Sequence, residues 1–243
     1  MKYVVDDTSL ISIADAIRAK TGKTEELTLA EMPTEIGNIE AGGGSNQDLI
    51  DGRLTGTWTS IDSDVTKVID HACRNLTSLK TVNLPKCTNI GLYAFYGCST
   101  LHTLNAPLCT NVSAYAFQNC YELLNLNLPK VVSILIGCFQ NNYALQKADF
   151  EVAKSIAANS FASCRSLTAL ILRKSDAICT LANTSAFTGT PIADGTGYIY
   201  VPRALIASYQ TATNWSNFST QFRALEDYTV DGTITGELDL TKI

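Results

Sequence analysis

The fold is decided by the stretch Ile90-Gly-Leu-Tyr-Ala-Phe-Tyr-Gly-Cys-Ser-Thr-Leu-His-Thr-Leu104, because related stretches recur along the chain at a constant spacing. Leu101 of this stretch belongs to a column of leucines that stand 22 residues apart. The column reads Leu79, Leu101, Leu123, Leu145 and Leu167. A fixed repeat of this length is typical of a solenoid, in which each repeat is one rung that stacks on the next.

Other positions keep the same register as the leucines. Phenylalanine stands six residues before the leucine in most rungs, and apolar residues stand three and five residues after it. The four further columns are Cys73, Phe95, Phe117, Phe139 and Phe161; Val82, Leu104, Leu126, Ala148 and Leu170; Leu84, Ala106, Leu128, Phe150 and Leu172; and Val68, Ile90, Val112, Ile134, Ile156 and Ile178. The alternation in L-x-L predicts one short strand per rung, so stacking gives a parallel ladder with an aromatic stack inside. Proline ends the strand in three rungs because it lacks an N–H, at Pro85, Pro107 and Pro129.

This pattern resembles the BspA-like branch of the leucine-rich repeats, whose rungs run roughly I-G-x-x-A-F-x-x-C-x-x-L-x-x-L-x-L-P. The resemblance covers residues from about 61 to about 226. It departs at Asn142, which stands in the cysteine position, and at Glu151 and Arg173, which replace the proline. The resemblance implies a leucine-rich-repeat solenoid with short parallel β-strands in each 22-residue rung. It also implies extracellular adhesion or recognition, with diverse ligands.

Changes in composition and residue pattern along the chain predict four parts. Residues 1–40 are expected to form a small helical N-terminal module, since Ser9 to Lys20 carry an apolar helical face. Residues 41–48, with a run of three glycines, are expected to be a flexible linker. The solenoid takes residues 49–226, with an irregular α/β C-terminal cap from about 186. Residues 227–243 look hairpin-like, with Asp231-Gly232 as the turn.

The N-terminal segment carries a second resemblance. The phrase Ile13-Ala-Asp-Ala-Ile-Arg-Ala-Lys-Thr-Gly22 is similar to an N-terminal module of tail-associated proteins of phages and prophages of gut Firmicutes. This implies that residues 1–40 dock on other virion proteins. The alternative is that they form the N-terminal cap of the solenoid.

The register breaks near the C-terminal end, where Phe187 arrives four residues later than the period requires. Residues 198–202 are expected to form a final strand, and residues 203–213 a helix. Trp215, Phe218 and Phe222 follow at helical spacing and are expected to cover the open end of the core.

Charge and hydropathy exclude several classes of partner. The formal net charge of -5 gives no basic footprint, so nucleic-acid binding is not expected. No run approaches eighteen apolar residues, so membrane insertion is not expected. The start reaches Asp6-Asp7 after only two valines, which is unlike a secretory signal peptide. The location is therefore expected to be the virion if the protein derives from a phage, and the cell surface or extracellular space in the alternative.

The eight cysteines are interpreted as buried free thiols, because most of them fall in repeat columns. Neighbouring rungs bring Cys98 to Cys120 and Cys87 to Cys109, so a disulfide at either pair is the alternative. No C-x-x-C spacing exists, which argues against a structural zinc site.

No catalytic, cofactor-binding or metal-binding residue is predicted. The two histidines, His71 and His102, have no acid–base partner at a fixed spacing, and the glycine run lacks the lysine of a phosphate-binding loop. Neither an enzyme nor a cofactor is therefore expected.

The outward positions of the strands give the candidate ligand face. One column reads Thr81, Thr103, Asn125, Lys147 and Ala169, and the other reads Asn83, Asn105, Asn127, Asp149 and Ile171. The candidate ligand face therefore consists of Thr81, Asn83, His102, Thr103, Asn105, Asn125, Asn127, Lys147 and Asp149. Such an array suits glycans or an extended polypeptide, but the asparagines are alternatively expected to bond one another along the ladder. A rival patch is formed by the tyrosines expected to be exposed: Tyr93, Tyr96, Tyr115 and Tyr121.

These observations predict a non-enzymatic recognition or structural module whose partner is a protein or glycan on a cell surface. The leading hypothesis is a phage or prophage tail-associated protein that binds a bacterial surface through its solenoid. The alternative is a cell-surface adhesin of a gut bacterium that binds a host protein or glycan.

Overall fold

The computed structural model describes Leu54 and residues 57–228. The chain divides into two units, Met1–Ala41 and Gly42–Ile243, and the described residues belong to the second. The predicted N-terminal module, the linker and the tail from residue 229 onward lie outside the described residues.

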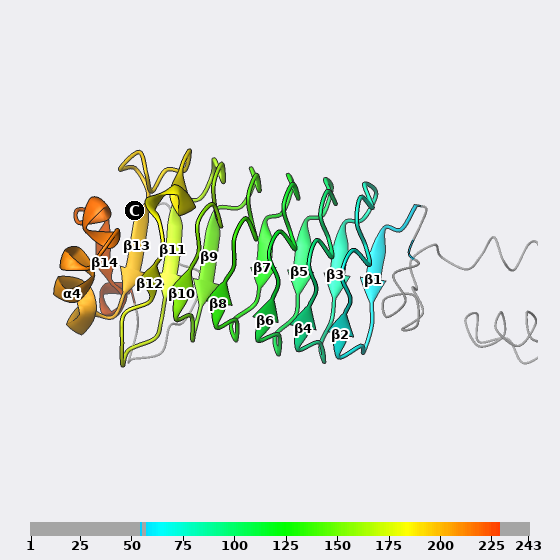
Figure 1. Ribbon diagram of the computed structural model, residues 1–243, viewed down its shortest axis with the longest axis horizontal. Coiled ribbons are helices and arrows are strands. Elements are labelled where there is room, and N and C mark those ends of the chain that lie inside the picture. The colour runs from blue at the N-terminus through cyan, green and yellow to red at the C-terminus, as the bar shows by residue number, and fades with distance from the viewer. Residues whose placement is uncertain (1–53, 55–56, 229–243) are drawn as a thin grey trace, which may run out of the picture. The chain divides into compact units, whose positions relative to one another are not determined.

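The repeats line up side by side and contribute strands to two rows (Figure 1). The first row holds the predicted L-x-L strands, as two four-stranded sheets: β1 (Ser60–Asp62), β3 (Thr81–Asn83), β5 (Thr103–Asn105) and β7 (Asn125–Asn127), then β9 (Lys147–Phe150), β11 (Ala169–Leu172), β13 (Tyr198–Val201) and β14 (Phe222–Ala224). The second row is one six-stranded sheet of two-residue strands, which the sequence pattern did not indicate: β2 (Lys67–Val68), β4 (Asn89–Ile90), β6 (Asn111–Val112), β8 (Ser133–Ile134), β10 (Ser155–Ile156) and β12 (Thr180–Leu181).

All of these pairings are parallel, and most keep the 22-residue register of the sequence. Thr81 lies opposite Thr103, which lies opposite Asn125. The predicted parallel ladder is therefore confirmed, and each column of the sequence becomes a row of stacked side chains.

Proline sets the strand length as predicted. The strands β3, β5 and β7 are three residues long, and a proline follows each of them after one residue. The strands β9 and β11 lack that proline and are four residues long. Beyond them the N–H of Glu151 donates to the carbonyl of Pro129 at 3.0 Å, and the N–H of Arg173 to the carbonyl of Phe150 at 3.0 Å. A residue with an N–H thus extends the ladder where proline stops it.

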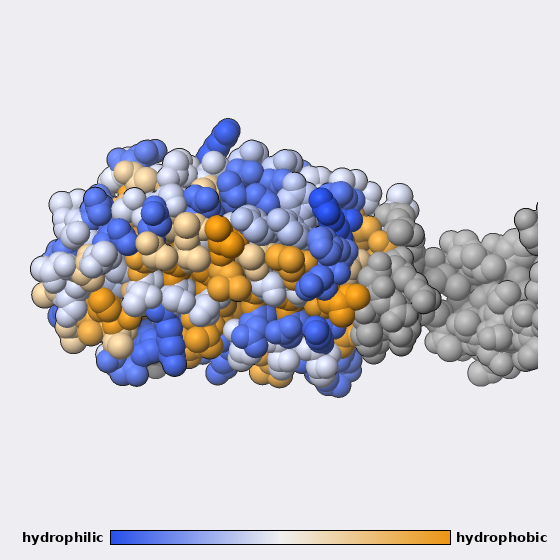
Figure 2. All heavy atoms as spheres, in the orientation of Figure 1, coloured by the Kyte–Doolittle hydropathy of each residue, from blue (hydrophilic) through white to orange (hydrophobic). Residues whose placement is uncertain are grey.

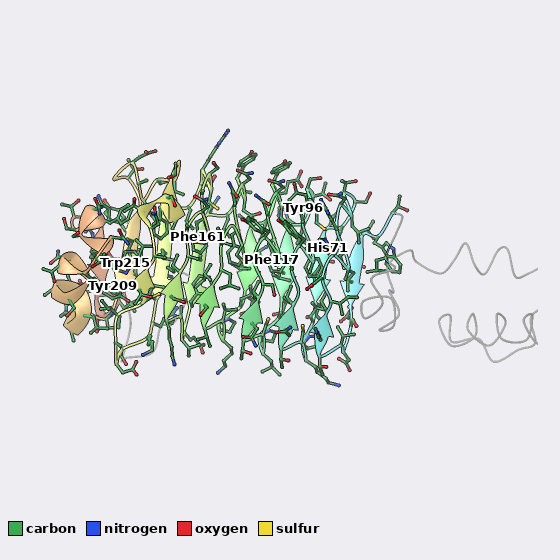
Figure 3. The ribbon with its side chains drawn as sticks, in the orientation of Figure 1. His71, Tyr96, Phe117, Phe161, Tyr209 and Trp215 are labelled. Atoms are coloured by element: carbon green, nitrogen blue, oxygen red, sulfur yellow. The ribbon has the colours of Figure 1, made fainter. Side chains whose placement is uncertain are left out.

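The core between the two rows is built from the predicted columns. The five repeat leucines are fully buried. The rings of Phe95, Phe117, Phe139 and Phe161 stack with successive centroid distances of 5.2, 5.7 and 5.4 Å, and Phe187 continues the stack at 5.9 Å. Figure 3 shows Phe117 and Phe161 inside the stack of rungs.

The cysteine column explains why Asn142 replaces a cysteine in one rung. The thiols of Cys98, Cys120 and Cys164 each lie within hydrogen-bond distance of the carbonyl 25 residues earlier, at 3.0 to 3.3 Å. The Nδ2 of Asn142 donates to the equivalent carbonyl of Phe117 at 3.1 Å. Its Oδ1, however, is buried and has no hydrogen-bond partner within the described part of the chain. The amide keeps the donor of the column but adds an unsatisfied acceptor.

The register slips after β11. Ile156 pairs with Leu181, at a separation of 25 residues, so the inserted residues lie largely between β11 and β12. The prediction that Ile178 belongs to the apolar column is wrong, because the insertion moves Leu181 into that place. Ile178 is half-buried and packs at the edge of the core.

The C-terminal region differs from the expectation in two respects. Residues 198–202 do not form the last strand, because β14 pairs with β13. Phe222 begins β14 and does not continue a helix with Trp215 and Phe218, which lie in the 3-10 turn η3 (Trp215–Phe218). The expected helix over 203–213 is a 3-10 turn, η2 (Arg203–Leu205), followed by α4 (Ile206–Thr211). Two further 3-10 turns are η1 (Thr184–Phe187) and η4 (Leu225–Tyr228).

Aromatic rings from these turns lie against the last ring of the stack. The rings of Trp215 and Phe218 are 5.9 and 5.5 Å from the ring of Phe187. Trp215 is fully buried, and its Nε1 donates to the carbonyl of Cys179 at 2.6 Å. Tyr209 on α4 accepts a hydrogen bond from the N–H of Cys179 at 2.7 Å. Figure 3 shows Trp215 and Tyr209 at the C-terminal end of the stack.

The unsatisfied acceptor of Asn142 yields a stability prediction. Asn142→Cys should raise the free energy of unfolding by about 1–3 kcal/mol, because it keeps a donor for Phe117 and removes the buried orphan Oδ1. Urea denaturation followed by circular dichroism measures the change. The control Asn142→Val should be less stable than Asn142→Cys, since it leaves the carbonyl of Phe117 unpaired. A cysteine variant less stable than the wild type would contradict this account.

Candidate functional site

An amide ladder runs along the outward face of β3, β5 and β7. Asn83 donates from Nδ2 to Oδ1 of Asp62 at 2.8 Å, Asn105 to Asn83 at 2.7 Å, and Asn127 to Asn105 at 2.6 Å. This is the structural arrangement that the sequence left open as the alternative to a ligand face. The amides inside the ladder are satisfied by each other, so the chemistry that remains available lies at its end.

The ladder ends between Asn127 and Asp149. A carboxylate has no N–H, so Asp149 cannot donate to the Oδ1 of Asn127. Arg173 instead holds Asp149 from the other side, through Nε to Oδ1 at 2.7 Å and Nη2 to Oδ2 at 2.6 Å. Every earlier step of the ladder pairs an amide N–H with an oxygen. Between Asn127 and Asp149, by contrast, an amide oxygen faces carboxylate oxygens, and no hydrogen bond can form between them.

The sheet itself is open at the same place, since β7 and β9 belong to different sheets. In other rungs of this row, the backbone N–H of the first strand residue donates to a carbonyl of the preceding rung. The N–H of Thr103 donates to the carbonyl of Lys80 at 3.1 Å, and the N–H of Ala169 donates to that of Gln146 at 3.2 Å. Among the described residues, Lys147 has no such backbone bond to the preceding rung. The gap is short, because backbone hydrogen bonds join the two rungs on either side of it. The N–H of Ala144 donates to the carbonyl of Tyr121, and the N–H of Glu151 donates to that of Pro129, both at 3.0 Å. The second row stays continuous through β6, β8 and β10.

The opening coincides with a rung that departs from the repeat. Phe150 stands in a column that holds leucine or alanine in the other rungs, and it is fully buried. Its ring lies 6.3 Å from that of Phe161, tilted by 55°. Cores are close-packed, so a ring in a place that fits leucine displaces its neighbours. We attribute the separation of β9 from β7 to this larger side chain.

A hollow of about 410 Å³ lies at the opening. Small-molecule sites occupy about 300–1,000 Å³ and combine apolar walls with a few polar groups. Apolar residues of the lining are Leu104, Leu124 and Leu126. The polar residues are Thr103, Asn105, Asn125, Asn127, Lys147 and Asp149, all of them predicted face residues. Figure 2 shows hydrophobic residues at the surface around β7 and β9, between polar rows.

Three predicted face residues, Thr81, Asn83 and His102, do not line this hollow. Three lining residues were missed, namely Leu104, Leu124 and Leu126. Leu126 belongs to the inward column but is only half-buried, and Leu124 replaces the His102 of the preceding rung. A leucine in a repeat column carries no sign of exposure, so the sequence could not reveal this.

The outward columns do not continue to the end of the sheet. Ala169 and Ile171 were expected to face outward, but both are fully buried in a second cluster with Tyr200 and Leu225. Tyr198 and Tyr228 pack against the same cluster. The expectation is wrong for these two positions because the C-terminal strand and turn cover them.

The tyrosine patch is less exposed than expected. Only Tyr121, at 39%, counts as exposed among the four, and the other three are half-buried. Tyr93 stacks on His71 at 5.3 Å and on Tyr115 at 5.0 Å, so these rings cover one another's faces. Arg74 lies over the rings of both Tyr93 and Tyr96. Because their faces are occupied within the chain, the patch offers a ligand mainly ring edges.

All eight cysteines are free and buried. Burial raises the pKa of Cys98 and of Cys164 to about 12, which leaves both as inert thiols. Cys87 differs, because a hydrogen bond from the Cys109 thiol lowers its pKa to about 7. The same contact, together with burial, raises the pKa of Cys109. Cys87 and Cys109, which the sequence offered as a possible disulfide, are thus two free thiols in contact with each other.

Within the described part of the chain, no three His, Cys, Asp or Glu side chains cluster as metal ligands. That part also holds no helix with the length and apolar character needed to cross a membrane.

The chain belongs to the BspA type leucine rich repeat family, whose repeat region matches six copies over residues 66–193. No curated protein sequence matches the chain.

The chain is similar to solved structures of leucine-rich repeat proteins. A leucine-rich repeat protein from Bacteroides ovatus is 21% identical, covers 68% of this chain and 45% of its own, and has a TM-score of 0.44. This chain therefore spans less than half of that protein's length. A leucine rich cell surface protein from Faecalibacterium prausnitzii is 17% identical, covers 74% of this chain and 72% of its own, and has a TM-score of 0.30.

The opening can be tested by amide hydrogen exchange. The N–H groups of Lys147 and Leu128 should exchange at least about tenfold faster than those of Thr103 and Ala106, because a backbone hydrogen bond protects the latter pair. Exchange followed residue by residue by NMR measures the difference. Equal protection at the two rungs would show that β7 and β9 pair in solution.

Proposed function

We propose that this protein is a non-enzymatic recognition module that binds a cell-surface ligand, protein or glycan, at the opening between β7 and β9. The observation that carries the proposal is the end of the amide ladder. There a hollow with leucine walls gathers Asn125, Asn127, Lys147 and Asp149, and the side-chain oxygens of the two asparagines accept no hydrogen bond from any described residue.

We further infer that the rungs form a stiff solenoid closed at its C-terminal end. The contacts of Trp215 and Phe218 with Phe187 support a capping role, since an uncovered end would expose the last ring of the aromatic stack. A rigid frame suits recognition because little conformational entropy is lost when a ligand binds to preformed groups.

The chemistry of the described residues supports a binding role over an enzymatic one. His71 is stacked on Tyr93, and His102 has no acid–base partner among them. The thiol with the lowest pKa, Cys87, is buried away from the hollow. A nucleophile and a base within reach of each other are thus not assembled at the opening.

For the biological setting, we propose a phage or prophage tail-associated protein that binds a bacterial surface. The resemblance of Ile13 to Gly22 to tail-protein modules supports this reading, with residues 1–40 docking on other virion proteins. The second candidate is a cell-surface adhesin of a gut bacterium that binds a host protein or glycan. Membership of the BspA type repeat family favours it.

Binding at the opening is tested by Asn125→Arg. Asn125 is exposed, and the one hydrogen bond of its side-chain amide to a described residue is a long one, 3.4 Å to Thr103, so the arginine should block the hollow without unfolding the chain. Binding to a panel of gut bacterial cells and host mucins, measured by flow cytometry and plate capture, should fall at least about tenfold, as for loss of a central contact.

Thr81→Arg is the matched control. It places the same charge on the same row of strands but outside the hollow, and it should leave both binding and the thermal unfolding midpoint unchanged. Full binding by Asn125→Arg would overturn the proposed site. Wild-type binding to bacterial cells favours the tail protein, whereas binding to mucins favours the adhesin.

Removal of residues 1–45 tests the role of the N-terminal part. We expect the thermal unfolding midpoint of the repeats to stay within about 2 °C of the full chain, because a docking module adds nothing to the repeat core. Differential scanning calorimetry measures this. A large fall of the midpoint would show that the segment is the N-terminal cap and not a docking module.

A further inference from the structure

The opening between β7 and β9 presents hydrogen-bond acceptors in excess. Asn125 and Asn127 use their Nδ2 groups within the ladder, toward Thr103 and Asn105, and their Oδ1 atoms accept no hydrogen bond from the described residues. Asp149 adds carboxylate oxygens on the opposite strand. A complementary ligand must therefore bring several closely spaced donors, as the hydroxyl groups of a sugar do.

The charges at the opening favour an anion. Arg173 neutralises Asp149 through two hydrogen bonds, while Lys147 makes no ion pair with any described residue. Lys147 and Arg173 against Asp149 leave one net positive charge at this place, although the chain as a whole is negative. A cationic ligand would meet Lys147 unfavourably, whereas a carboxylate would pair with it.

The spacing of these groups fits one ring. Lys147 and Asp149 face the same side of β9 two residues apart, which is about 6.6 Å along the strand. A ring lying along β9 can thus place a carboxylate at Lys147 and its hydroxyls at Asp149 and Asn127. The exposed parts of Leu124 and Leu126 supply an apolar surface for the C–H face of the ring.

We propose that the opening binds an acidic sugar, a pyranose ring that carries a carboxylate and neighbouring hydroxyl groups. This inference rests on the proposed recognition function and names the class of its ligand. An acidic peptide shares the anion, but it lacks the adjacent hydroxyl donors that Asn127 and Asp149 both accept.

The probes are D-glucuronic acid, D-glucose, N-acetylneuraminic acid and tetraglutamate, each titrated into the full chain and followed by NMR. D-Glucose is the matched neutral control, since it has a hydroxymethyl group where glucuronic acid has the carboxylate. We expect glucuronic acid to bind at least about tenfold more tightly than glucose, with amide shifts at Asn125, Asn127 and Lys147. N-Acetylneuraminic acid distinguishes the two kinds of carboxylated sugar, and binding of either in preference to glucose supports the proposal.

Lys147→Gln should abolish the preference for the carboxylated sugar over glucose, because it removes the ammonium and keeps a polar side chain. Lys80→Gln is the control, since Lys80 is exposed at the edge of the same row and lies outside the hollow; the preference should survive. Equal affinity for glucose, shifts away from the opening, or tighter binding of tetraglutamate would each overturn the proposal.

The cell-binding result for Asn125→Arg separates this inference from the proposed function. If Asn125→Arg loses cell binding but no carboxylated sugar binds, the ligand class is wrong and recognition at the opening stands. If Asn125→Arg binds cells as the wild type does, the site and its ligand class are both overturned.

Discussion

Backbone hydrogen bonds join each rung to the next, and the rest of the structure depends on the register that they keep. Because the strands are parallel and mostly 22 residues apart, equivalent side chains stack directly on each other. This produces the phenylalanine stack, the column of thiol contacts and the amide ladder from one rule. One rung cannot bury its own apolar face, so the stability of each rung is shared with its neighbours.

Because equivalent residues stack on each other, a rung with unusual residues changes the contacts to its neighbours. Asn142, Ala148, Phe150 and Glu151 all depart from their columns within one repeat. Asn142 and Glu151 preserve the contacts of the stack, because one supplies a substitute donor and the other an additional N–H. Phe150 is larger than the leucine or alanine of its column, and the first row of strands opens beside it while the second row stays continuous.

The proposed binding site lies where the hydrogen bonds between successive rungs stop. Along the asparagine ladder, the side-chain amides hydrogen-bond to one another and offer few free groups to a ligand. At its end the donor is missing, the strands separate, and Lys147, which makes no ion pair with a described residue, stands beside the neutralised Asp149. The tyrosine rings, by contrast, are arranged to cover one another and Arg74.

Local periodicity that repeats from rung to rung was enough to predict the family, the parallel ladder, the aromatic core and the strand length set by proline. It also placed Asn125, Asn127, Lys147 and Asp149 on one face. It did not reveal the second row of strands, whose two-residue length is too short for a period, or the burial of Ala169 and Ile171 by a later segment. Which part of the face is open emerged from the folded chain alone, because the separation of β9 from β7, which we attribute to the bulk of Phe150, arises from packing between neighbouring rungs.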